Sequence, residues 1–128
     1  MKIKSVKRLQ KELLRVPAPV YPDVEETEAW YRLFNRIIFD GALPKILIQI
    51  SPLKNSHGWC KIYHDENCPI ELVLTTRFPN MRTYLEVLVH EMIHVFQHLH
   101  EGKMTHGPTM FQWRSRLEQY HLGLSTKY

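Results

Sequence analysis

The sequence predicts a single α+β domain in which a small sheet of three to four strands packs against one long helix, with further helices flanking it. Three observations lead to this fold class. Apolar residues recur at helical spacing towards both ends of the chain, and three short apolar or β-branched runs lie between turn residues in the middle. The 128 residues, 44% of them hydrophobic, suffice for one core and are too few for two domains.

The first expected element is an amphipathic helix over residues 2–15. Its apolar residues stand three and four places apart, and they are Ile3, Val6, Leu9 and Leu13. Its other side is basic and carries Lys4, Lys7, Arg8, Lys11 and Arg15. Residues 1–16 supply a charge of +5 and residues 17–128 sum to −1, for a net charge of +4. We therefore expect a basic N-terminal helix over 1–16 and a nearly neutral domain over 17–128.

A second helix is expected over about residues 24–39. Three prolines interrupt the first helix, and Asp23 with Glu26 then forms a capping-box pattern ahead of apolar residues at helical spacing that continue to Gly41. The segments 46–50, 57–63 and 70–76 follow, and their β-branched and alternating residues predict three strands.

Two more helices are expected in the C-terminal half. Apolar residues at helical spacing begin after Asn80, a favourable N-cap, and stop near Gly102, which favours a helix end. A last helix is expected from Pro108 to Tyr120.

The composition excludes several classes of protein. No apolar run approaches the roughly 18 residues that a membrane span needs, and the basic N-terminus lacks the features of a signal peptide. We expect a protein that is not secreted and that stays in the cytoplasm, the nucleoid or nucleus, or a host cytoplasm if it is viral. Cys60 and Cys68 are too few for a four-cysteine zinc ribbon, and we interpret them as free thiols.

The most informative segment is His90-Glu91-Met92-Ile93-His94. Histidines four apart on a helix lie within about 40° of each other and about 5–6 Å apart along the axis, so both imidazoles can reach one metal ion. Glu91 is displaced around the helix, where it would reach a metal-bound water as a general base. The alternative is a pair of ordinary core histidines. The metal site is favoured because polar groups on an otherwise apolar helix need partners.

The third metal ligand must come from elsewhere in the chain. His98 lies about 6 Å further along the helix, too far to share the ion. His100 stands where metzincins place a third histidine, but Gln97 replaces the glycine that would break the helix there. His106 is better placed, because Gly102 lets the chain turn back, and Glu118 is the reserve candidate.

These residues resemble the SprT-like zinc metalloprotease family. The resemblance rests on the motif at 90–94, on His106-Gly107-Pro108 and on the aromatic helix that follows. It extends upstream to Gly58 and the 70–76 strand, and so covers about residues 24–121. It implies a zincin-like fold, one Zn²⁺ per chain held by His90, His94 and His106, and catalysis by Glu91. The C-terminal zinc ribbon of many members has no counterpart here, since no cysteine follows Cys68.

The proposed chemistry is hydrolysis of a peptide bond by a zinc-activated water, with Glu91 as the general base. The substrate would be a protein or peptide, and the resemblance to DNA-dependent proteases extends this to proteins bound or crosslinked to DNA. One alternative is a binding module that keeps zinc and hydrolyses nothing. Another is nucleic-acid binding through the basic N-terminal helix. The competing interpretation is that this charged face is simply solvated, as is usual for an amphipathic helix. No membrane partner is expected, and the sequence leaves the oligomeric state open.

Overall fold

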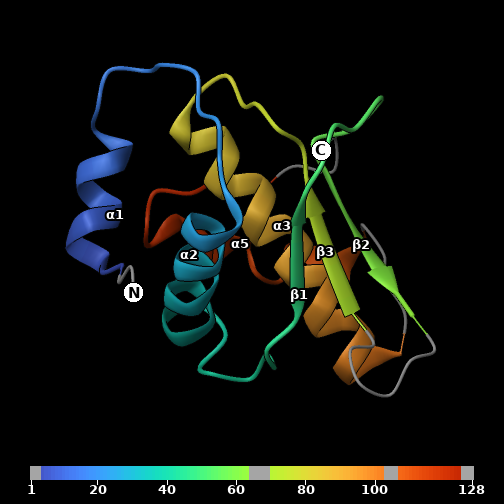
Figure 1. Ribbon diagram of the computed structural model, residues 1–128. Helices are drawn as coiled ribbons and strands as arrows, with labels where there is room; N and C mark the ends of the chain where they lie inside the picture. Colours follow the sequence, from blue (N-terminus) through green and yellow to red (C-terminus); the bar gives the residue numbers. More distant parts are fainter. Residues whose placement is uncertain (1–3, 64–69, 103–106, 125–128) are drawn as a thin grey trace.

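The computed structural model describes residues 4–63, 70–102 and 107–124 (Figure 1). The elements in chain order are α1 (Val6–Leu13), α2 (Val24–Ile37), β1 (Leu47–Ile50), β2 (Gly58–Ile62), β3 (Ile70–Leu74), α3 (Met81–Glu101), α4 (Pro108–Phe111) and α5 (Arg114–Glu118). The predicted α+β class is confirmed. None of the described helices has the length and apolar character needed to cross a bilayer.

The described strands form one sheet in the order β1-β3-β2. β1 runs parallel to β3, and β2 runs antiparallel to it. The central strand β3 is buried at all five positions, including Glu71, whose carboxylate accepts a hydrogen bond from the Tyr63 hydroxyl at 2.7 Å. β1 and β2 are the outer strands, and their exposed residues alternate with buried or half-buried ones.

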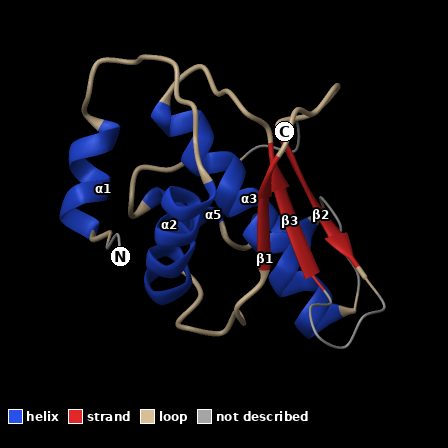
Figure 2. Cartoon of the chain, viewed as in Figure 1, coloured by secondary structure: helices blue, strands red, loops and turns tan. Residues whose placement is uncertain are grey.

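The helices gather on one face of the sheet (Figure 2). α3 packs against β2 and β3, whereas α2 packs against β1 and α3. The core between these layers holds large side chains that are fully buried, among them Trp30, Phe34, Phe39, Phe78 and Tyr84. α3 is therefore a central element, with the sheet on one side and α1, α2 and α4 in contact with it.

Gly58 allows β2 to approach the sheet and α3 closely. A Cβ atom placed at this residue would stand 2.8 Å from Leu74 Cδ2, 3.1 Å from the backbone oxygen of Val73 and 3.1 Å from Val87 Cγ1. All three distances are shorter than ordinary Cβ contacts. The Leu74 side chain can shift, but the Val73 oxygen belongs to the backbone, so a larger residue would push β2 away from β3 or from α3.

α2 begins and ends close to the predicted positions. The Asp23 side chain accepts a hydrogen bond from the backbone N–H of Glu26 at 2.7 Å, which is the expected N-cap. After the helix, the side-chain amide of Asn35 donates to the backbone oxygen of Leu43 at 2.8 Å and accepts from its N–H at 3.0 Å. This pair of bonds holds the turn that leads from α2 towards β1.

The prediction of a single helix from Pro108 to Tyr120 is wrong, because the structure has two short helices there, α4 and α5. The side-chain amide of Gln112 donates to the backbone oxygen of Thr109 at 2.8 Å, and the N–H of Trp113 bonds to the oxygen of Met110 at 3.2 Å. A continuous α-helix would bond Trp113 to Thr109 instead. The break turns the Trp113 ring between Phe39 and Phe96, each with its ring centroid 4.8 Å away.

Candidate metal centre

The site predicted from the sequence lies in the middle of α3. The Asn80 side chain caps this helix by accepting a hydrogen bond from the N–H of Thr83 at 2.8 Å. Gly102 ends it with φ of 74°, in the left-handed region that favours glycine. The helix is therefore fixed at both ends and continues past the predicted ligands without the break that a metzincin would have.

His90 and His94 lie side by side on the buried face of α3. Their side chains are 3% and 7% exposed, and their ring centroids are 4.9 Å apart with the ring planes at 84°. The spacing of four residues places the rings one helical turn apart. Two imidazoles at this separation present nitrogen donors of the kind that zinc and other borderline metal ions prefer.

Glu91 lies in the same buried region. Its side chain is 5% exposed, and its Oε2 atom lies 3.9 Å from Nε2 of His90. Burial raises the pKa of Glu91 to about 8, because desolvation penalises the charged carboxylate. A carboxyl group that changes protonation near neutral pH has the property that general acid–base catalysis requires.

Gln97 is a further residue of this site, although from the sequence it was notable only for replacing a glycine. Its side chain is fully buried, and its Oε1 lies 2.9 Å from Nδ1 of His94. Its Nε2 donates to Oγ1 of Thr109 in α4 at 3.3 Å. One feature of the sequence could have pointed to Gln97: it lies three residues after His94, on the same side of the helix.

The third predicted ligand, His106, lies outside the described residues. Within 4–63, 70–102 and 107–124, no three His, Cys, Asp or Glu side chains form a group that could hold a metal ion. His98, His100 and Glu118 therefore do not complete a site with His90 and His94. His100 is exposed, and its ring contacts the Phe96 ring, with centroids 4.3 Å apart and the ring planes at 30°.

Cys60 on β2 is a free cysteine close enough to Glu91 for their charges to interact. Burial, and secondarily the Glu91 carboxylate, raise the pKa of Cys60 to about 12. The thiol therefore stays protonated at neutral pH, unlike the thiolate of a nucleophilic or metal-binding cysteine. Cys68 lies outside the described residues.

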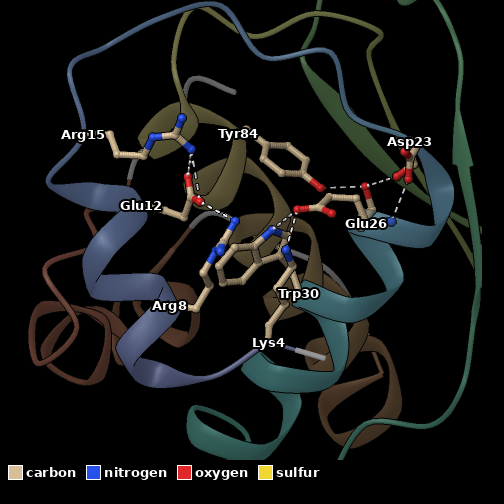
Figure 3. Close-up of polar contacts among 9 residues, drawn as sticks. Lys4, Arg8, Glu12, Arg15, Asp23, Glu26, Trp30 and Tyr84 are labelled. Carbon is tan, nitrogen blue, oxygen red and sulfur yellow. Dashed lines mark hydrogen bonds and ion pairs between the residues drawn. The ribbon is translucent and has the colours of Figure 1, made fainter. Parts of the chain in front are cut away.

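The predicted basic stripe on α1 is partly neutralised by acids of the same protein (Figure 3). Lys4 Nζ lies 2.7 Å from Oε1 of Glu26 in α2. Arg8 and Arg15 both pair with the buried carboxylate of Glu12, each at 3.0 Å. Lys7 and Lys11 are exposed.

A second group of contacts in Figure 3 ties Lys4, just before α1, to α2 and ties α2 to α3. The Lys4 ammonium lies 4.9 Å from the centre of the Trp30 ring, and the Trp30 indole donates to Glu26 at 3.2 Å. Thr27 and Tyr84 share a buried hydrogen bond of 2.7 Å between α2 and α3. Leu9 of α1 is fully buried in the core that these helices share.

The SprT-like family model matches residues 27–127. The match begins inside α2 and includes the whole sheet, α3 with His90, Glu91 and His94, and the C-terminal helices. No curated protein matches the sequence at a significant level.

Proposed function

Because the chain belongs to the SprT-like family, we propose that it is a zinc-dependent metallopeptidase. The family is associated with metallopeptidase function and with zinc. The observation that carries the proposal is the buried cluster on α3, in which two neighbouring imidazoles and a carboxyl group of raised pKa share one turn of helix. Titratable groups with strongly shifted pKa values gather at functional sites.

The donor set fits zinc. His90 and His94 would be two ligands, and we propose His106 as the third. The position of Thr109 supports this choice: three residues after His106, the chain is already in contact with Gln97, one turn beyond His94. Three histidine ligands leave one coordination position open, as in catalytic zinc sites.

The Glu91 carboxylate would perform the proton transfers of peptide hydrolysis. Zinc, when bound, lowers the pKa of its water to near 7 and polarises a carbonyl oxygen. Glu91 would accept the proton of the attacking water and deliver it to the leaving amine, so that no covalent enzyme intermediate forms. Its buried position keeps bulk water from competing for that proton.

We propose a polypeptide substrate that lies along β2. This strand pairs with β3 on one edge, its other edge faces away from the sheet, and it packs directly against α3. An extended peptide can add to such an edge through backbone hydrogen bonds. Proteins bound or crosslinked to DNA are the substrate class that the family resemblance suggests.

Zinc content and one matched pair of variants test this proposal. We expect about one zinc per chain, and Glu91→Gln is expected to retain zinc and lose hydrolysis of a casein or DNA-binding protein substrate. Glu101→Gln, the same substitution at an exposed position of α3, is the control and should keep wild-type activity. A metal-free wild-type protein after purification in zinc-containing buffer would end the proposal.

A zinc-containing binding module is the main alternative. A structural zinc has four protein ligands, whereas a catalytic one keeps an open position. X-ray absorption of the zinc-loaded protein separates the two, because a fourth protein ligand would favour the binding module. Retained hydrolysis in Glu91→Gln would also contradict the role given to Glu91.

DNA binding through α1 is a separate proposal, and the exposed residues Lys7 and Lys11 are the ones that would contact phosphates. Lys7→Glu/Lys11→Glu should weaken salt-sensitive binding to single-stranded DNA and leave hydrolysis of a free peptide unchanged. Unchanged DNA affinity would mean that these lysines contact only solvent. Charge reversal is preferable to truncation, since Leu9 on the opposite side of α1 is buried in the core.

A further inference from the structure

Gln97 joins the candidate metal centre to the helix that follows it. We propose that Gln97 is a positioning residue that holds His94 with its Nδ1 atom protonated and its Nε2 atom available to a metal ion. The part of this proposal that concerns zinc rests on the proposed function, whereas the part that concerns the imidazole can be tested on the metal-free protein.

The hydrogen-bond pattern of the amide carries the argument. The Gln97 amide nitrogen is a donor only, and it is used on Thr109 Oγ1 at 3.3 Å. This leaves the amide oxygen, an acceptor only, at 2.9 Å from Nδ1 of His94. An acceptor at this distance requires a proton on Nδ1, so the lone pair of the neutral ring lies on Nε2.

Burial makes the arrangement specific. Gln97 is 0% exposed and His94 is 7% exposed, so water cannot easily replace the bond between them. A buried amide that loses a partner leaves an unpaired polar group in the protein interior, which is unfavourable. A metal-binding histidine commonly donates its second N–H to a fixed acceptor, which orients the ring and raises its basicity as a ligand.

The same residue links two segments of the site. Gln97 and His94 are three residues apart on α3, so their side chains lie on one side of the helix. Thr109 belongs to α4, which contacts α3. Gln97 thus takes the position at which a metzincin has glycine, and it couples the orientation of His94 to the position of α4.

The first experiment observes the His94 ring of the wild-type protein directly. Long-range ¹H–¹⁵N correlation spectra of the metal-free protein at about pH 8 distinguish the two neutral imidazole tautomers, and a His94→Gln variant identifies the His94 signals. We expect the Nδ1–H form for His94. The Nε2–H form would overturn the proposal, because it would mean that the Gln97 amide is turned and that Thr109 donates to it.

Three variants then test the effect on metal binding. Gln97→Met has a similar volume and no hydrogen bonds, and it should weaken zinc binding by about 10–100-fold in competition with a chelator. Gln97→Glu restores an acceptor next to Nδ1 and should recover most of that loss. Thr27→Val removes a buried hydrogen bond to Tyr84 elsewhere in the core, so it controls for general destabilisation and should change zinc affinity by less than about 2-fold.

The Co²⁺-substituted proteins provide a readout besides activity. The visible absorption of Co²⁺ reports ligand geometry, so we expect a shifted band in Gln97→Met and a wild-type band in Thr27→Val. Equal zinc affinities for wild type and Gln97→Met would overturn the positioning role. If the wild-type protein binds no zinc, the proposed function fails while the tautomer of His94 still decides the role of Gln97.

Discussion

Replacing Leu9 by alanine tests whether α1 is part of the folded domain. Leu9 is 0% exposed and belongs to the same core cluster as Trp30 and Tyr84. Leu9→Ala removes three buried carbon atoms, which at about 0.8 kcal/mol each gives about 2.4 kcal/mol of lost transfer free energy. The cavity that remains brings the expected loss in the free energy of unfolding to about 2.5–5 kcal/mol.

Leu14→Ala is the matched control for this substitution. Leu14 follows α1 directly and is 86% exposed, so the same change should alter the free energy of unfolding by less than about 0.5 kcal/mol. Urea unfolding of both variants, followed by far-UV circular dichroism and by tryptophan fluorescence, measures the difference. A loss for Leu9→Ala within about 0.5 kcal/mol of that for Leu14→Ala would contradict this prediction, because α1 would then contribute no burial to the core.

Three further predictions concern β2 and the metal centre. Gly58→Ala should destabilise the protein by about 1–3 kcal/mol in urea unfolding, because its Cβ meets the Val73 backbone oxygen at 3.1 Å; an unchanged midpoint would contradict this close packing. In a Cys68→Ser background, Cys60 should react with iodoacetamide at pH 9 roughly a hundredfold or more slowly in the native protein than in urea. An ordinary thiol is near half ionised at that pH whereas one with a pKa of about 12 is not, and equal rates would contradict the raised pKa. Zinc at about 100 times its dissociation constant should stabilise the wild-type protein by about 2.7 kcal/mol and leave His94→Ala unaffected, and an equal gain in both would place the ion elsewhere.

The helical part of the fold could largely be predicted from local signals. Asp23, Asn80 and Gly102 are strong start and stop residues, and the structure uses each of them as predicted. The prediction of a continuous helix from Pro108 failed because the break between α4 and α5 involves the Gln112 side chain and the packing of Trp113. Both are tertiary effects that helical periodicity does not record.

The candidate site, too, could be predicted only in part from the sequence. His90, Glu91 and His94 are close in sequence on one helix, so their spacing alone predicts that they lie together. The choice of His106 stays a prediction, since it lies outside the described residues. Gln97 was missed because its role depends on burial and on Thr109, which comes twelve residues later and on another helix.

The position of α1 also bears on the order of folding during synthesis. Val20 pairs with Phe78 through two backbone hydrogen bonds of 2.9 Å, and α1 contacts α3, which begins at Met81. The first helix therefore leaves the ribosome well before its partners. A helix of eight residues is marginal on its own, and contacts between distant residues form slowly. Until α3 has emerged, α1 lacks a helix against which it packs in the native structure, and the docking of the N-terminal helix becomes a late step that completes the domain.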